Sequence, residues 1–446
     1  MRQQLNALFN SLSKPVDILP LVIFRVAFGV LMLFSTVRFM LNGWVQEFYV
    51  EPVYHFTYLG FAWVQPLPPL WMHGVFVGLA ILSVLIAVGA FYRLSITTFF
   101  LLFTYVELID KTYYLNHYYF ISVMSLLMIV LPLHRKWAVD SWLSPHIKAD
   151  YVPAWTLYAP RLMLGIVYFY AGLAKLTPDW LLGALPLRIW LPANATFPVI
   201  GKWFDYVWVA YAMSWAGALY DLSIGFLLSW RRTRPLAYSV VIGFHLMTTL
   251  LFNIGVFPWV MIACTLIFFD GRDWRWLAQA VKLHVSPMPD APKKLSTSPL
   301  IAILIMCFFL WQLLMPLRHL AYPGNHLWTN EGYRFAWHVM LVEKNGTVIY
   351  RIEDPDSERF WVVFPDAYLT RQQEQQMSFQ PDMILQFAHF LVDEYAVQCE
   401  CQPEVYADTY VSFNRRAGQP IILPNTDLAN EAYSWQPRSW IMPLHE

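Results

Sequence analysis

The chain has 446 residues, of which 58% are hydrophobic and only 13% are charged. Soluble domains usually carry about a quarter of their residues as charged side chains, so water is not the main solvent of this chain. The formal net charge is zero, which gives no positive excess for nucleic acid, and we expect no such partner. Aromatic residues make up 17% of the sequence, as is typical near lipid headgroups. The expected partner is the lipid bilayer.

Apolar segments long enough to cross a bilayer recur through the first 316 residues. A spanning helix needs about 20 mainly apolar residues. We predict a multi-pass α-helical membrane protein, with residues 1–316 as its helical catalytic domain. The sequence favours about nine transmembrane helices, near Ile18–Phe39, Trp71–Ala90, Leu94–Ile109, Tyr118–Leu133, Leu157–Ala174, Val207–Leu228, Leu236–Leu251, Val256–Phe269 and Pro299–Met315. Met1–Asp17 shows no small-residue cleavage site, so we expect it to be retained.

Basic residues are distributed unevenly between the loops, and short basic loops stay cytoplasmic. If the N-terminus is inside, the inside loops hold residues such as Arg93, Arg135, Lys136, Arg231, Arg232 and Arg234. The opposite loops hold few, of which Lys111, Arg188 and Lys202 are the clear cases. An odd number of spans then places the C-terminal part outside. We expect a multi-pass protein of the cell (inner) membrane with a cytoplasmic N-terminus.

The character of the sequence changes after Leu317, where charged residues return. Gly346–Arg351 and Arg359–Phe364 are typical of short strands, joined by Asn-Gly and Asp-Pro turns. Met383–Tyr395 has the pattern of an amphipathic helix. Residues 317–446 are therefore predicted to form a strand-rich, extracytoplasmic α+β domain.

Polar and ionisable residues within or beside the apolar segments are the candidates for function, because such groups at membrane depth are costly and usually face a cavity or a partner. They are Asn116 and His117 at the entry to the fourth segment, Lys175 at the end of the fifth, Asp221 in the sixth and His245 in the seventh. Asn116, His117 and Lys175 all fall near the outer leaflet. We therefore expect these three to share one cavity.

Each candidate has a simpler alternative. Lys175 could extend from a helix end to the headgroups, and His245 could be a hydrogen-bonded core histidine. The pair Asp110–Lys111 could be an interfacial ion pair, and Asp221 could pair with Arg25 as a structural contact. The four cysteines lack the spacing of a zinc site or a redox CxxC, so no catalytic role and no metal are predicted for them.

Longer motifs are more specific. They are Phe24-Arg25-x-x-Phe28-Gly29, Asp110-Lys111-Thr112 with Asn116-His117, Trp137-x-Val139-Asp140, Tyr168-Phe169-x-Ala171-Gly172-x-x-Lys175-Leu176-x-x-Asp179-Trp180, Phe244-His245 with Phe252-x-Ile254-Gly255-x-Phe257, Arg318-His319-x-x-Tyr322-Pro323-Gly324 and Trp328-Thr329-Asn330-Glu331-Gly332-Tyr333. This ordered set resembles the vitamin K-dependent gamma-glutamyl carboxylase family over nearly the whole chain.

The resemblance implies an enzyme, a carboxylase of the lyase class with a coupled vitamin K epoxidase activity. Family members oxidise reduced vitamin K, the hydroquinone, with O2 to the epoxide. They use the energy released to remove a γ-proton from a peptidyl glutamate, to which CO2 adds. The implied cofactor is vitamin K hydroquinone or a menaquinol, and the implied partner is a glutamate-containing protein or peptide.

The resemblance also assigns residues. Lys175 takes the place of the family's catalytic lysine, whose amine can act as a base only when it is neutral. Asn116 and His117 match residues near the quinone oxygens, and His245 matches a further histidine. The substrate-binding residues implied are Arg188 near the glutamate, with Trp328, Asn330, Glu331 and Tyr333 at the substrate entrance. No metal is implied.

Departures from the family leave alternatives open. Animal members have a longer outer region that helps to capture the propeptide of their substrates, so this chain corresponds to a compact, bacterial-type homologue. Their paired cysteines have no counterpart here, because Cys399 and Cys401 are too close to bridge comfortably within one extended segment. The first alternative is a quinol epoxidase or oxygenase that carboxylates no protein. The second is a non-catalytic transporter or quinone-binding membrane protein, which the lack of Gly/Pro-broken repeat helices disfavours.

Overall fold

The computed structural model describes residues 11–252, 254–280, 282, 289–292, 295 and 297–445. All nine predicted apolar segments coincide with helices: α2 (Leu19–Leu41), α3 (Pro69–Val88), α4 (Tyr92–Ile109), α5 (Asn116–Val130), α7 (Trp155–Leu173), α10 (Val207–Ser229), α11 (Arg234–Leu251), α12 (Phe257–Thr265) and α14 (Pro299–Leu314). Shorter helices lie between them: α6 (Val139–Leu143), α8 (Pro178–Leu181), α9 (Leu187–Trp190) and α13 (Gly271–Ala280). The first ten residues of the predicted retained segment lie outside the described part of the chain.

Four helices are long and apolar enough to cross a bilayer: Leu19–Leu41, Pro69–Val88, Tyr92–Ile109 and Pro299–Ala321, where the last includes the 3-10 helix η7 (Met315–Ala321). Two further apolar helices, Asn116–Val130 and Phe257–Phe268, are shorter. These helices identify a membrane protein with at least several spans. The number nine stays a prediction, because several of the other helices are shorter than a bilayer requires or carry polar residues.

Local sequence signals set the helix ends. Helix α3 begins with Pro69, whose missing N–H costs nothing in a first turn. It ends at Val88 and is followed by Gly89, which has a φ of +68°, a left-handed conformation that suits glycine. The same glycine lets the Arg25 guanidinium approach, because a Cβ there would lie 2.4 Å from Arg25 Nη1. Arg25 donates to the carbonyls of Leu133 and Trp137, so the suggested pairing of Arg25 with Asp221 is wrong.

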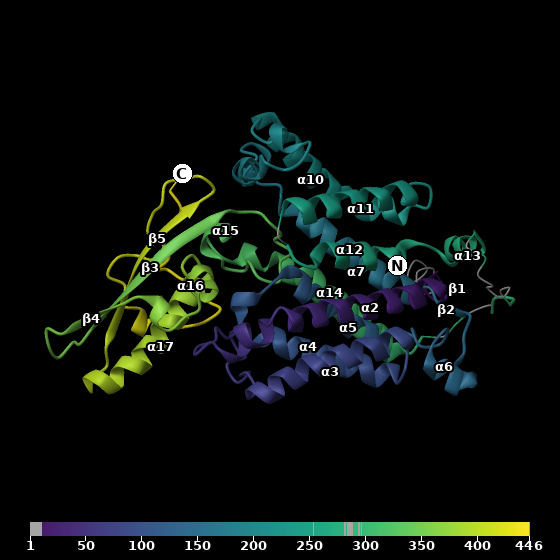
Figure 1. The fold of residues 1–446 in the computed structure, drawn as a ribbon, viewed down its shortest axis with the longest axis horizontal. Helices are drawn as coiled ribbons and strands as arrows, with labels where there is room; N and C mark the ends of the chain where they lie inside the picture. Colours follow the sequence, from purple (N-terminus) through teal and green to yellow (C-terminus); the bar gives the residue numbers. More distant parts are fainter. Residues whose placement is uncertain are drawn as a thin grey trace.

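The two ends of the molecule differ in structure (Figure 1). Helices α2, α3, α4 and α5 run along the long axis. At one end lies the C-terminal sheet with its helices, and at the other lie β1 (Pro15–Asp17), β2 (Tyr151–Pro153), α6 and α13. Strands β1 and β2 pair antiparallel, with Val16 opposite Val152. Pairing of the N-terminal segment with a loop that follows α6 closes this end of the helical part.

The C-terminal part is an α+β unit. Its antiparallel sheet has the order β4-β3-β5, made of β3 (Lys344–Glu353), β4 (Phe360–Val363) and β5 (Glu404–Phe413). Helices α15 (His326–Thr329), α16 (Arg371–Met377) and α17 (Pro381–Cys399) accompany it. Two predicted strands and the predicted helix are confirmed, whereas β5 was not predicted. The Asn345-Gly346 turn is wrong because both residues lie inside β3, and Gly346 allows close contact with the Ser378 carbonyl.

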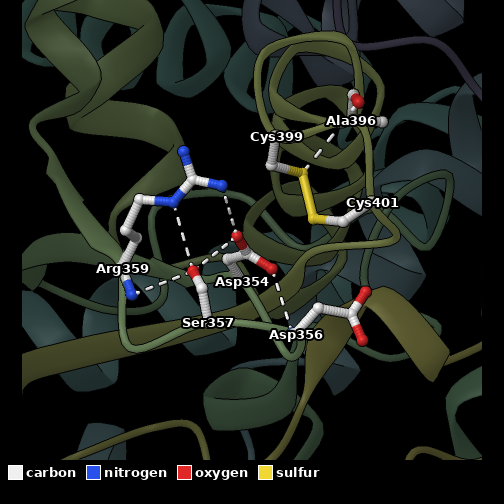
Figure 2. Close-up of a disulfide and its surroundings, with 7 residues drawn as sticks. All are labelled: Asp354, Asp356, Ser357, Arg359, Ala396, Cys399 and Cys401. Atoms are coloured by element: carbon white, nitrogen blue, oxygen red, sulfur yellow. Dashed lines mark hydrogen bonds and ion pairs between the residues drawn. A yellow bond between two sulfur atoms is a disulfide. The ribbon is translucent and has the colours of Figure 1, made fainter.

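Cys399 and Cys401 form a disulfide, contrary to the expectation from their spacing. Figure 2 shows the bond together with the turn Asp354–Arg359 that joins β3 to β4. The expectation assumed an extended segment, but α17 ends at Cys399 and Glu400 takes a φ of +55°. This left-handed residue turns the chain and brings the two Cα atoms to 5.1 Å, within the range that a disulfide spans.

A buried ion-pair network joins the helical and C-terminal parts. Lys111 Nζ lies 2.8 Å from Asp382 Oδ2, and Arg334 Nη1 lies 2.7 Å from the same oxygen. The Tyr433 hydroxyl accepts a second hydrogen bond from Lys111. Burial lowers the pKa of Lys111 to about 8, whereas Arg334 and Lys111 outweigh burial and hold the pKa of Asp382 well below its usual range. The suggested Asp110–Lys111 ion pair is wrong, because Lys111 is turned toward α17.

Candidate functional site

A largely apolar cavity of about 420 Å³ lies between α7, α10, α11 and α12, beside the segment that carries Val339 and Met340. Its size falls within the usual range for small-molecule sites, which are mostly apolar with a few convergent polar groups. Apolar lining residues include Val167, Met213, Phe244, Leu251, Phe257 and Met261. Polar groups reach it from Lys175, Asp221, His245, Tyr168 and Tyr220.

Lys175 is buried at this cavity and does not extend to the surface. Its Nζ lies 2.7 Å from Asp221 Oδ2 and donates to the Ala171 carbonyl at 3.2 Å. The ammonium also lies 5.3 Å from the centroid of the Trp180 ring, a distance at which a cation is attracted to the ring face. The structure therefore supports the cavity interpretation of Lys175 over the headgroup interpretation.

The sequence of α7 explains how Lys175 reaches this position. Tyr168, Ala171 and Lys175 are spaced three and four residues apart, so they lie on one face of the helix and its last turn. Gly172 lets that face approach α10, because a Cβ there would lie 2.7 Å from the backbone nitrogen of Leu222. Asp221 directly precedes Leu222 in α10, so this close approach brings the Asp221 carboxylate next to the Lys175 amine.

His245 of α11 lies at the same cavity. Its Nε2 is 3.4 Å from the hydroxyls of both Tyr168 and Tyr220. Its Nδ1 is buried and has no hydrogen-bond partner among the described residues. Burying such an atom is unfavourable unless another group forms a hydrogen bond with it. A cavity with an unpaired ring nitrogen and a lysine amine fits a ligand that is mostly apolar and carries polar oxygens.

Asn116 and His117 lie beside this cavity but not among its lining residues. The His117 ring centroid is 5.7 Å from that of Phe257, and the Phe257 centroid is also 5.7 Å from that of His245. Asn116 donates through its amide to the His338 carbonyl at 2.7 Å. The structure thus brings Lys175 and His245 to one cavity and places Asn116 and His117 beside it rather than among its lining residues.

Arg188 does not line the cavity either. It lies in α9, whose Leu187 and Trp190 do line it. The Arg188 side chain is half-buried, and its Nε has no partner among the described residues. The guanidinium is therefore near the site without being part of its wall.

The four predicted substrate-entrance residues do not form one common site. Trp328 is a core residue that donates to the Met442 carbonyl. Asn330 and Glu331 line a second, small polar pocket of about 70 Å³ beside the buried ion-pair network. Burial raises the pKa of Glu331, and Arg438 opposes this shift. Tyr333 packs on the ring of His338 at 5.1 Å.

Sequence reasoning missed the role of Asp221 as partner of Lys175. The signal was an aspartate within an apolar helix, but its partner depends on how two distant helices pack. It also missed a group of three histidines, His319, His326 and His338, whose ligand atoms lie within 4.8 Å of one another. No metal was expected from the sequence, and this is the one such group among the described residues.

Comparisons with known families agree with this organisation. A family model described as the HTTM domain matches residues 13–274, which contain the cavity helices. A second, described as the vitamin K-dependent gamma-carboxylase lumenal domain, matches residues 297–446. No solved structure matches the chain. With both matches in order along one chain, the protein belongs to the vitamin K-dependent gamma-carboxylase family.

Proposed function

We propose that this chain is a carboxylase-like enzyme that uses vitamin K hydroquinone, or a menaquinol, at the Lys175 cavity. The observation that carries the proposal is a buried lysine–aspartate pair, 2.7 Å apart, on the wall of an apolar cavity of about 420 Å³. A quinol head group has oxygens for Lys175 and His245, and its apolar ring and tail suit the remaining wall. With O2, a bound quinol supplies the energy and the strong base needed to remove a γ-proton from glutamate.

The protein's part in this chemistry is proton transfer from the quinol hydroxyl. Lys175 can accept a proton only as the neutral amine, so its ammonium proton must first pass to Asp221 Oδ2. A low-dielectric wall favours this transfer, because it turns a charge-separated pair into two neutral groups. Asp221 is thus proposed as the proton store and Lys175 as the general base.

His245 is proposed to orient the quinol. Two tyrosine hydroxyls hold its Nε2 at 3.4 Å, and the ring is 2% exposed. The unpartnered Nδ1 is then available for a quinol oxygen. The apolar residues around it keep water out, which protects reactive species from hydrolysis and proton leakage.

A second candidate function is quinol oxidation without protein carboxylation. It is favoured by the position of the predicted glutamate-binding residues, none of which lines the cavity in the described part of the chain. In either case the lumenal name of the C-terminal family match supports an extracytoplasmic C-terminal part. We also propose that the protein lies in the cell (inner) membrane and that its N-terminus is cytoplasmic.

The test uses purified full-length protein in detergent with vitamin K hydroquinone, O2, labelled bicarbonate and a glutamate peptide. Epoxide and incorporated label are measured separately, in wild type, Lys175→Ala and the control Lys202→Ala, which changes an exposed lysine. Both products in wild type and in the control, with both lost in Lys175→Ala, support the carboxylase. Epoxide without label supports the second candidate. Full epoxidation by Lys175→Ala contradicts the assigned base.

A further inference from the structure

A cluster of three histidines lies where the last apolar helix meets the C-terminal part. His319 belongs to η7, which continues α14, and His326 begins α15. His338 lies in the segment between α15 and β3. The ring centroids are 4.2 to 5.3 Å apart, and one ligand atom from each residue lies within 4.8 Å of the others. Three separate segments thus bring ring nitrogens to one point.

His319 has the orientation that a metal-binding histidine usually has. Its Nδ1 lies 2.9 Å from the carbonyl oxygen of Pro316. Because a carbonyl can only accept, Nδ1 carries the hydrogen and Nε2 keeps its lone pair. Metal-ligating histidines almost always donate their other ring N–H in this way, which fixes both tautomer and ring orientation.

His338 supplies a second, independent observation. Its side chain is 3% exposed, and its Nδ1 is buried without a hydrogen-bond partner among the described residues. Buried polar atoms are nearly always paired. The half-buried rings of His319 and His326 leave an approach from solvent to this otherwise closed position.

We propose that His319, His326 and His338 bind one divalent transition-metal ion of the zinc class. Neutral imidazoles suit zinc, copper or nickel, whereas magnesium and calcium prefer oxygen ligands. Tetrahedral zinc–nitrogen bonds of about 2.0–2.1 Å place two ligand nitrogens roughly 3.3–3.4 Å apart, so ligand atoms that now lie within 4.8 Å of one another approach by up to about 1.4 Å when the ion binds. With three protein ligands, the fourth position holds water.

The ion would position a wall of the proposed active-site cavity. The His338 carbonyl accepts the Asn116 amide, which ties this residue to α5. The two residues that follow, Val339 and Met340, line the cavity. Joining His338 to His319 and His326 therefore fixes this wall to the end of α14 and to α15. The histidines are positioning residues in this proposal.

The first experiment measures metal content. Full-length protein with an affinity tag free of histidine is stripped with a chelator, incubated with equimolar ZnCl2, desalted and analysed by mass spectrometry. About one zinc ion per chain is expected. Retention of no zinc by the wild type overturns the proposal, because it would mean that the rings only pack against one another.

Variants localise the ion. In His326→Gln/His338→Gln, zinc retention should fall by at least about tenfold, since even groups that only support ligands have effects of that size. The control His445→Gln changes an exposed histidine and should keep its zinc. Retention by the double variant overturns the site.

A spectroscopic measurement covers the case in which the double variant does not fold. Co2+ added to metal-free wild type should give the intense visible d–d absorption of a four-coordinate ion, and zinc should abolish it. A spectrum of six-coordinate cobalt, or none, overturns the site. Neither measurement uses quinol turnover, so a negative result for the metal is distinct from a failure of the proposed function.

Discussion

Two buried lysine–aspartate pairs have nearly equal lengths and very different surroundings. Lys175 lies 2.7 Å from Asp221 on the wall of an apolar cavity, and Lys111 lies 2.8 Å from Asp382. Asp382 also pairs with Arg334, and Lys111 also bonds Tyr433. The first pair keeps few alternative partners in the described residues, whereas the second is part of a network.

The difference fits the roles that we propose for the two pairs. In the network, each charge is held by several groups, so any transfer of a proton disturbs them all. At the cavity, the proposed transfer of a proton from Lys175 to Asp221 involves a single ion pair. The Lys111 pair is therefore interpreted as a structural link between domains and the Lys175 pair as a reactive one.

The largest expected effect comes from replacing the reactive pair by apolar residues. Lys175→Met/Asp221→Leu should lower quinol epoxidation by about 10²–10⁴-fold, the usual contribution of a general base. Its stability should stay unchanged or rise by about 1–4 kcal/mol, because apolar residues often replace a buried ion pair at no cost. The measurements are epoxide formation and thermal unfolding in detergent. Retained epoxidation by a folded double variant would contradict the distinction between the pairs.

Removing one member of the network should have the opposite signature. Asp382→Asn leaves Lys111 and Arg334 buried without their carboxylate, which costs about 3–5 kcal/mol. The chain should unfold at lower temperature in detergent, with the protein that remains folded still active. Asp356→Asn, an exposed carboxylate of the same domain, is the control. Equal stability of the two variants would show that the ion-pair network contributes little to the free energy of unfolding.

The close approach of α7 and α10 gives a smaller effect. Gly172→Ala places a methyl group 2.7 Å from the Leu222 nitrogen and should destabilise by about 1–3 kcal/mol through overpacking. It should also lower epoxidation, because Lys175 follows within the same turn. Gly165→Ala is a matched control in the same helix, where a Cβ meets nothing within 4 Å. Two variants with the same unfolding temperature would contradict the proposed packing.

The last prediction concerns Lys344, a buried lysine whose hydrogen bonds go to neutral oxygens. It donates to the Trp328 carbonyl and Asn330 Oδ1, and burial lowers its pKa from 10.5 to about 7. Between these values the unfolded chain holds a proton that the folded chain lacks. The free energy of unfolding should therefore rise with pH by up to about 1.4 kcal/mol per pH unit. Below pH 7 the folded chain also holds the proton and bears the full cost of burying the charged ammonium.

Denaturant unfolding of wild type and Lys344→Met at pH 6.5 to 9.5 measures this dependence. The variant should lose the rise with pH, and its advantage over wild type should be largest at the acid end of the series. Parallel pH profiles for the two proteins would mean that Lys344 does not titrate in this range.

Residue patterns within one segment were enough to predict much of the fold. All nine apolar segments became helices, and Pro69 and Gly89 show why such ends can be located from sequence. Asp221 and Lys111 show what could not be predicted, because Asp221 was paired with Arg25 and Lys111 with its neighbour Asp110. Their actual partners, Lys175 and Asp382, depend on the packing of distant segments.

The site was predicted in the same uneven way. Motif resemblance located Lys175 and His245, which the structure brings to one cavity. The same resemblance could not show that His245 lines the cavity while His117 only contacts Phe257 of its wall. The bond between Cys399 and Cys401 depended on one left-handed residue, Glu400, whose conformation is not encoded by cysteine spacing.

The ribbon of β1 and β2 has a consequence for how the chain is made. The ribosome synthesises Pro15–Asp17 before its partner strand Tyr151–Pro153. Helices α2 to α6 are made between the two strands. During that interval the backbone donors and acceptors of the leading segment have no sheet partner. Strand β1 therefore stays unpaired during the first part of synthesis. The two-stranded sheet at the proposed cytoplasmic end forms only after several helices have entered the bilayer.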